Sequence, residues 1–159
     1  MSNRRDSLLR AFIESDASPD GKWWLDFPVG LTVSDGADPP TIDAICLTDR
    51  EQELPEVYPD HTGVPYVVHP GDEYAGVTKE DALRSLLGTD SFVEETVTLV
   101  AVDPDASSVG TVGELLACRE LLEADWEWDV AELLLLSADD DARVNYVCRE
   151  LSIRAVRVA

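Results

Sequence analysis

Basic residues are scarce in this sequence, and lysine is nearly absent. Only Lys22 and Lys79 are lysine among the 12 basic residues, whereas Asp and Glu together number 33 and the formal net charge is -21. The acidic residues are spread along the chain and do not form a tail. A dispersed acidic excess is typical of a cytosolic protein from an organism that lives in molar salt, where screening removes most of the self-repulsion. The alternative interpretation is an acidic protein that binds basic partners.

Long apolar runs and paired cysteines are also missing. No stretch approaches the ~20 apolar residues of a membrane-spanning helix, and we expect no signal peptide, because no apolar run follows the short basic start. The three cysteines, Cys46, Cys118 and Cys148, fit neither a disulfide framework nor a zinc site. We therefore expect buried, reduced thiols in a cytoplasmic protein without membrane contact. The charge gives no support to nucleic acid as a partner, and the sequence leaves the oligomeric state open.

What the sequence does contain is enough apolar material for a core, at 45 % hydrophobic residues, and a length that suits one domain over residues 1–159. Apolar periodicity predicts helices at 6–17, 78–87, 109–124 and 138–153, and strands at 22–33, 41–47, 97–103, 131–137 and 154–158. The first two strands are predicted to form a hairpin, and the last three are predicted to run parallel with helical crossover connections between them. With the stretch at about 49–95 taken as an insertion, the order is α-β-β-β-α-β-α-β. This order predicts an α/β fold with a central mixed sheet flanked by helices.

That order, with "TIDAICL" in the second strand, resembles the PD-(D/E)xK nuclease superfamily and its restriction-endonuclease-like fold. The segment "LVAVDPDASSVGTVGELLACRELLEADW" looks like the strand and helix that follow in that family. The resemblance implies that Asp43 stands where those nucleases have a metal-binding aspartate. It also implies that Ala101 and Asp103 replace the glutamate and lysine of the E-x-K motif. In the helix, Glu114 and Cys118 take the positions of a glutamine and a tyrosine.

These departures predict a loss of catalysis. Hydrolysis in such nucleases needs carboxylates that converge on a divalent cation and a lysine that meets developing negative charge. Ala101 offers no oxygen, and Asp103 would repel both the phosphate and the attacking hydroxide. Our first hypothesis is therefore a nuclease-like domain without activity that acts as a binding or regulatory module and needs no cofactor.

Two alternatives stay open. Asp43, Asp103 and Glu114, with Glu14 as a fourth carboxylate, could hold Mg²⁺ or Mn²⁺ in a rearranged site and support a metal-dependent nuclease. Against this, Asp103 has the character of a solvated strand-end acid before a proline, and Glu114 that of an exposed helix residue. A third hypothesis is an unrelated doubly wound α/β domain, which would lack the adjacency of the second and third strands.

The remaining polar and aromatic candidates carry weaker signals. Arg119 lies near the apolar stripe of its helix and is a candidate partner for a buried acid such as Asp43 or Asp103, where its charge would replace that of a metal. The other candidates are two histidines in the insertion, His61 and His69, and four tryptophans, Trp23, Trp24, Trp126 and Trp128. One basic cluster is made of Arg4, Arg5 and Arg10 with Lys22. We expect the tryptophans to close the core and the basic cluster to be solvated beside the first helix.

Overall fold

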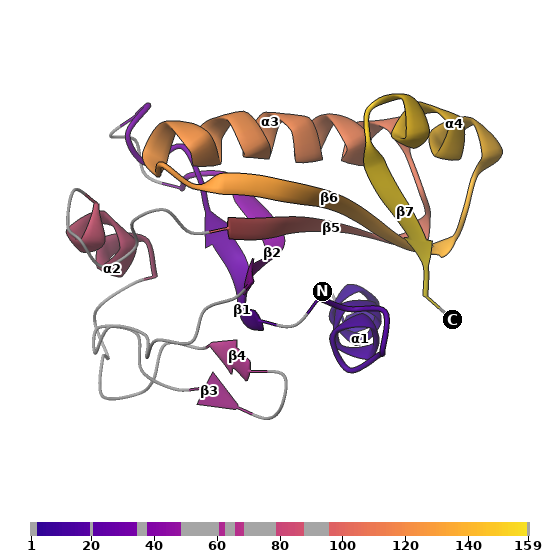
Figure 1. Cartoon of the computed structure of the whole chain (residues 1–159), viewed down its shortest axis with the longest axis horizontal. Helices are drawn as coiled ribbons and strands as arrows, with labels where there is room; N and C mark the ends of the chain where they lie inside the picture. The colour runs from indigo at the N-terminus through magenta and orange to yellow at the C-terminus, as the bar shows by residue number, and fades with distance from the viewer. Residues whose placement is uncertain are drawn as a thin grey trace.

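The computed structural model of this chain describes residues 3–19, 21–34, 38–48, 61–62, 66–68, 79–87 and 96–158. It is built on one mixed sheet with the strand order β3-β4-β1-β2-β5-β6-β7 (Figure 1). The strands are β1 (Gly21–Pro28), β2 (Thr41–Thr48), β3 (His61–Thr62), β4 (Tyr66–Val68), β5 (Thr96–Ala106), β6 (Asp129–Asp139) and β7 (Ile153–Arg157). The helices are α1 (Asn3–Ile13), α2 (Lys79–Leu86), α3 (Val109–Asp125) and α4 (Ala142–Glu150). The predicted α/β class with a mixed sheet between helices is confirmed.

The pairing of the long strands follows from their sequences. β1 and β2 form an antiparallel pair, β2 pairs antiparallel with β5, and β5, β6 and β7 run parallel. The four consecutive leucines of β6, Leu133 to Leu136, are all buried. A continuous apolar run is what a parallel strand needs when helices or chain cover both faces of its sheet.

Two apolar layers hold the helices on opposite faces of the sheet (Figure 1). On one face, Leu8, Leu9 and Phe12 of α1 pack in a cluster with residues of β1, β2, β5 and β6. On the other face, α3 and α4 cover a larger cluster that includes Leu115 and Leu122. All four tryptophans are buried in these layers, as expected, so none is available on the surface to stack on a base.

A local irregularity in the hairpin sets the position of Asp43. Asp26 in β1 has a φ of 50°, a left-handed conformation that non-glycine residues seldom adopt. The hairpin pairs Leu25 with Ala44 and Phe27 with Ile42, so Asp26 and Asp43 lie opposite one another. Strict alternation fails at this point, because Ile42 and Ile45 share one cluster although they are three positions apart and alternation would place them on opposite faces. The alternation of β2 side chains between the two faces of the sheet is therefore interrupted at Asp43.

Several predicted boundaries were wrong. The Asp-Pro-Asp segment at 103–105 does not stop β5, which continues to Ala106 and pairs with Asp139 after a register shift. β1 ends at Pro28 rather than at residue 33, and the last helix begins at Ala142 because Asp141 caps it. Of the insertion at about 49–95, only β3, β4 and residues 79–87 with α2 are described. His69 and the first residue of the helix predicted at 78–87 lie outside the described residues.

Candidate functional site

The candidate site forms where β2 and β5 separate. Regular pairing between these strands runs from Thr48 opposite Thr96 to Ala44 opposite Val100 and then stops. Beyond that point the backbone N–H of Val102 donates to Oδ2 of Asp43 at 2.6 Å. The side chain of Asp43 thus takes a donor that the ladder would otherwise pair with a strand carbonyl.

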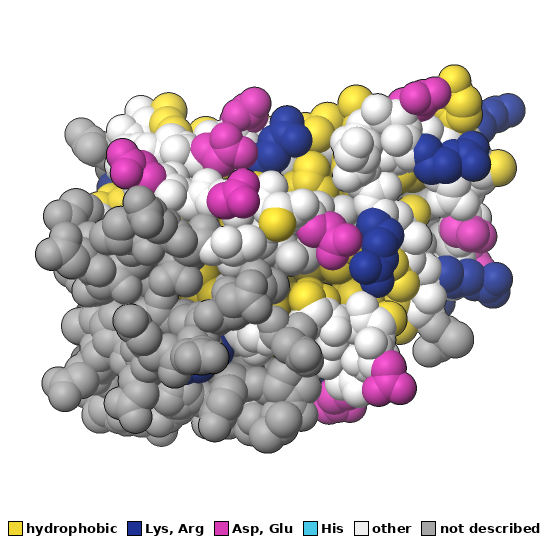
Figure 2. Space-filling view, in the orientation of Figure 1, with side chains coloured by type: hydrophobic (Ala, Val, Ile, Leu, Met, Phe, Trp, Pro, Cys, Tyr) yellow, Lys and Arg dark blue, Asp and Glu magenta, His cyan; other side chains and the backbone are white. Residues whose placement is uncertain are grey.

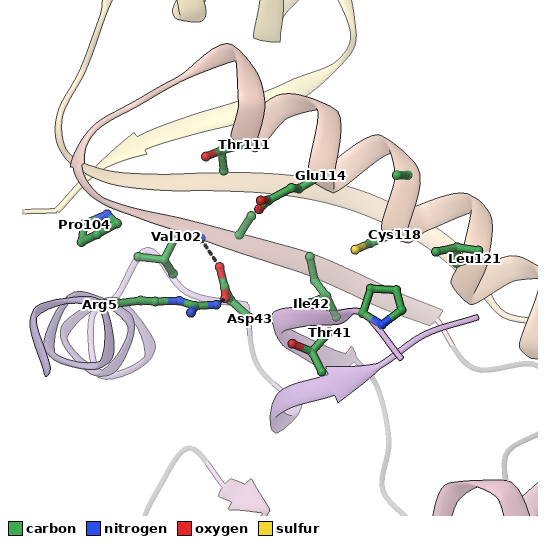
Figure 3. Close-up of a pocket in the computed structure, with 13 residues that line it drawn as sticks. Arg5, Thr41, Ile42, Asp43, Val102, Pro104, Thr111, Glu114, Cys118 and Leu121 are labelled. Carbon is green, nitrogen blue, oxygen red and sulfur yellow. Dashed lines mark hydrogen bonds and ion pairs between the residues drawn. The ribbon is translucent and has the colours of Figure 1, made fainter. Parts of the chain in front are cut away.

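Arg5 of α1 supplies the second partner of Asp43. Its Nη2 forms an ion pair with Oδ1 of Asp43 (Figure 3). The Asp43 side chain is only 7 % exposed, whereas that of Arg5 is 35 % exposed. A carboxylate buried to this degree needs a counter-charge and hydrogen bonds, because leaving it unpaired would cost several kcal/mol. Arg5 and the Val102 N–H meet that need on the two separate oxygens.

A pocket of about 610 Å³ opens beside this pair. Its walls come from α1, the start of β2, the end of β5 and one side of α3, and they include Arg5, Asp43, Ala101, Glu114 and Cys118. In Figure 3, Arg5 and Asp43 point toward one another while Glu114 and Cys118 reach in from α3. The remaining lining is largely apolar and includes Ile42, Val102, Pro104, Ala117 and Leu121. The pocket therefore combines a neutralised ion pair, one further carboxylate and apolar walls.

The carboxylates proposed from the sequence as metal ligands, those of Asp43, Asp103 and Glu114, do not come together around one point. Asp103 does not line the pocket; its Oδ2 accepts a hydrogen bond from Oγ1 of Thr111 at 2.9 Å. Glu114 lines the pocket from α3 and is exposed, whereas Asp43 is approached by α1 from the other face of the sheet. Among the described residues, no group of three or more His, Cys, Asp or Glu side chains is placed to hold a metal ion. Ala101 is buried in the apolar layer under α3.

Arg119 does not pair with Asp43, contrary to our expectation. Its guanidinium lies 3.9 Å from carboxylate oxygens of both Glu120 and Glu123 on its own helix. Arg5 holds the place that Arg119 was expected to take. The signal for this was present in the sequence, because Arg5 precedes the buried Leu8 and Leu9 by three and four residues and so lies toward the inner face of α1.

The other candidates lie apart from the pocket. Glu14 is exposed just after the end of α1, and Arg4 pairs with Asp105 at the surface, where both side chains are mostly exposed. His61 is in β3, and His69 is outside the described residues. The three cysteines are buried and free, as predicted.

Among the described residues that line the pocket, Cys118 supplies the thiol. Burial, and secondarily the nearby Glu114 carboxylate, raises the pKa of its thiol to about 11. A thiol with a raised pKa is almost entirely protonated near neutral pH, and the protonated form is a poor nucleophile. The raised pKa therefore disfavours the thiolate form of Cys118.

The fold and the site define this chain as an α/β domain whose sheet opens around an ion pair between the buried Asp43 and the half-buried Arg5. Comparison with family models, with curated proteins and with solved structures finds no match for this chain. Within the described residues, no helix has the length and apolar character needed to cross a lipid bilayer.

Proposed function

We propose that this chain is a nuclease-like α/β domain that does not cleave nucleic acid and that acts as a binding or regulatory module through the pocket beside Asp43. One observation carries the proposal: both oxygens of Asp43 are occupied by the protein's own donors, Arg5 and the N–H of Val102. The guanidinium supplies at this position the positive charge that a divalent cation would bring to a nuclease site.

The residues around Asp43 support the same conclusion. A hydrolytic metal centre needs at least two carboxylates on one cation. Ala101 provides no oxygen next to Asp43, and Asp103 is turned to Thr111. No lysine stands at either position to stabilise developing charge.

The restriction-endonuclease-like assignment is part of the proposal and rests on topology. β2, which carries "TIDAICL", lies directly beside β5, which carries "VTLVAVD". The third hypothesis, an unrelated doubly wound domain, has no need of this antiparallel neighbour. We further propose a cytoplasmic protein of a halophile, because the acidic residues are dispersed and lysine is nearly absent.

The alternative function, a metal-dependent nuclease with a rearranged acidic site, is favoured by one observation. Asp43 and Glu114 line the same pocket. For this alternative to hold, Mg²⁺ or Mn²⁺ would have to displace Arg5 from Asp43 and recruit Glu114 from α3.

Two measurements separate the functions. We expect no cleavage of end-labelled DNA or RNA in about molar KCl with Mg²⁺ or Mn²⁺, conditions in which surface repulsion is screened. We also expect the melting temperature to respond to Mn²⁺ equally in the wild type, in Glu114→Gln and in the matched control Glu120→Gln, which changes an exposed glutamate of α3 outside the pocket. A saturable Mn²⁺ stabilisation that Glu114→Gln alone abolishes, together with cleavage, would establish the nuclease instead.

A further inference from the structure

Arginines gather at one end of this acidic molecule. Residues 142–158 hold four of the 12 basic residues and, in Glu150, only one of the 33 acidic residues. Arg143, Arg149, Arg154 and Arg157 are all exposed. Figure 2 shows dark blue side chains, with some magenta ones between them, at the right-hand end, where Figure 1 places α4 and β7. Arg154 lies 3.5 Å from a carboxylate oxygen of Glu132, and Arg157 lies 3.6 Å from one of Asp139. We call this surface the arginine end.

Apolar side chains lie among these arginines. Tyr146 is 57 % exposed and Leu151 is 41 % exposed, although both belong to residue types that usually pack inward. The guanidinium carbon of Arg149 lies 6.0 Å from the centroid of the Tyr146 ring. Tyrosine and arginine are the residues that most often dominate the binding energy of protein interfaces.

The arginine end also contains an open sheet edge. β7 is the last strand in the sheet, and within the described part of the chain only β6 pairs with it. The N–H of Val158 donates to the carbonyl of Ser137 at 2.8 Å, so Val158 turns its backbone toward β6. Because successive residues of a strand alternate, the N–H and C=O of Ala155 and Arg157 point away from the sheet. Those groups can pair with a further strand.

We infer that the arginine end is a docking surface for an acidic, extended peptide segment of another protein, which adds to the sheet beside β7. Backbone pairing with β7 would give such a segment affinity, as in other cases of strand addition. Carboxylates along the segment would face Arg143 and Arg149, which make no ion pair with any described residue. Tyr146 and Leu151 would take an apolar side chain of the segment.

The charges argue against the two other occupants. If a second copy paired its own β7 antiparallel to this one about Ala155, Arg154 would lie opposite Val156, and the Arg154 side chains of the two copies would be diagonal neighbours on one face, where like charges repel. A nucleic acid duplex carries charge every ~1.7 Å and would extend past the arginine end onto a chain of net charge -21. A nucleic acid also lacks the regularly alternating N–H and C=O groups that would match the open edge of β7 along its length.

The first test uses a dye-labelled peptide of alternating glutamate and valine, followed by fluorescence anisotropy at about 0.1 M KCl, where charge pairs are not yet screened. We expect saturable binding that Arg149→Glu weakens roughly fivefold or more. Arg10→Glu is the matched control, because it also reverses an exposed arginine in the last turn of a helix. It should leave the affinity within about twofold, as expected for a change remote from the binding surface.

The second test asks for backbone pairing. The same peptide, N-methylated at every second residue, keeps its charge and loses its donors, and we expect its binding to fall at least about tenfold, as a loss of several backbone hydrogen bonds implies. Ala155→Pro removes a backbone donor from the open edge of β7 and should weaken peptide binding in the same way, while the side chains of α4 stay unchanged. Three results would overturn the inference: no binding of the acidic peptide, equal binding to Arg149→Glu, or tighter binding of a DNA or RNA oligonucleotide. Concentration-dependent dimerisation that Arg149→Glu prevents would assign the surface to a second copy instead.

Discussion

The backbone N–H of Val102 donates to Oδ2 of Asp43 at 2.6 Å, at the place where β2 and β5 stop pairing. Extending the ladder would bring Ile42 opposite Val102 and close the gap between the strands. The carboxylate takes the N–H in place of a strand carbonyl, and the strands diverge to form the pocket beside it. One side chain therefore ends the ladder and helps to form the pocket wall.

Removing the partner of Asp43 should destabilise the fold. Arg5→Ala leaves a carboxylate that is 7 % exposed without its counter-charge. Breaking a buried ion pair costs about 3–5 kcal/mol, and we expect roughly 2–3 kcal/mol here because Arg5 is itself about one-third exposed. Urea unfolding in constant high salt measures the change.

Arg4→Ala is the matched control for this experiment. Arg4 stands next to Arg5 in α1 and pairs with Asp105, but the two side chains are 66 % and 78 % exposed. Exposed pairs contribute little, so the free energy of unfolding should change by less than about 1 kcal/mol. Equal losses in the two variants would contradict the role assigned to the Arg5–Asp43 pair.

The coupling between Arg5 and Asp43 gives a second prediction. Asp43→Asn keeps a side-chain oxygen for the N–H of Val102 and removes the charge. In the Arg5→Ala background it should recover roughly 1–2 kcal/mol of the lost stability, because no buried charge remains to be compensated. A double-mutant cycle on the free energy of unfolding measures this term. Strictly additive losses would show that the two side chains do not interact.

Local sequence patterns predicted most of the strands and helices. The candidate site, in contrast, is formed mainly by contacts between residues that are distant in sequence. The leucine run of β6 and the mostly apolar residues of "TIDAICL" indicate their strands without outside information. The pair between Arg5 and Asp43 joins a helix to a strand. Helical spacing places Arg5 toward the inner face of α1, but it does not indicate which strand residue Arg5 meets. Arg119 was the wrong choice of partner, because its guanidinium lies near Glu120 and Glu123 of its own helix, 3.9 Å from an oxygen of each.

The irregularity at Asp26 was also beyond local prediction. Aspartate tolerates a left-handed φ more readily than most residues do, but nothing in "KWWLDFP" requires one. Sequence periodicity placed Asp43 correctly in an apolar strand. It could not show that β2 changes face at Asp43, because that change depends on the paired residue in β1.

The third prediction concerns Cys118. Burial raises the pKa of this thiol from 9.0 to about 11, and Glu114 adds to the effect. Alkylation by iodoacetamide, resolved by site with mass spectrometry, should therefore be slow at pH 8 and should rise only as the pH approaches 11. Glu114→Gln should move this profile to lower pH, and Glu120→Gln should not. A rate that levels off below about pH 9 would show an ordinary thiol.

The same pKa shift predicts how stability depends on pH. Below pH 9.0 the thiol keeps its proton in both the folded and the unfolded chain, and its contribution to stability is fully present. As the pH rises from 9.0 through about 11, the unfolded chain ionises first and the folded state loses that contribution. Cys118→Ala should flatten this part of the pH profile of the free energy of unfolding.

The N-terminus of α4 provides a fourth prediction. Oδ1 of Asp141 accepts hydrogen bonds from the N–H groups of Arg143 and Val144 at 2.8 and 3.2 Å. Asp141→Ala should cost about 1 kcal/mol, as the loss of a helix cap usually does. Asp140→Ala removes a neighbouring acid whose hydrogen bond to Asn145 is exposed, and it should cost less than about 0.5 kcal/mol. Comparable losses would mean that general charge, rather than the cap, stabilises α4.

The net charge of -21 gives the last prediction, which concerns salt. Raising KCl from about 0.1 M to about 1 M shortens the screening length from ~10 Å to ~3 Å and weakens repulsion among the dispersed carboxylates. The free energy of unfolding should then rise by at least about 1 kcal/mol, which corresponds to roughly 2–4 °C in melting temperature for a chain of this size. Sucrose of equal osmolality is the control, because it stabilises by exclusion from the protein surface and screens no charge. If sucrose raises the melting temperature as much as KCl does, repulsion is not what limits stability at low salt, and the acidic excess has to be explained by binding to basic partners.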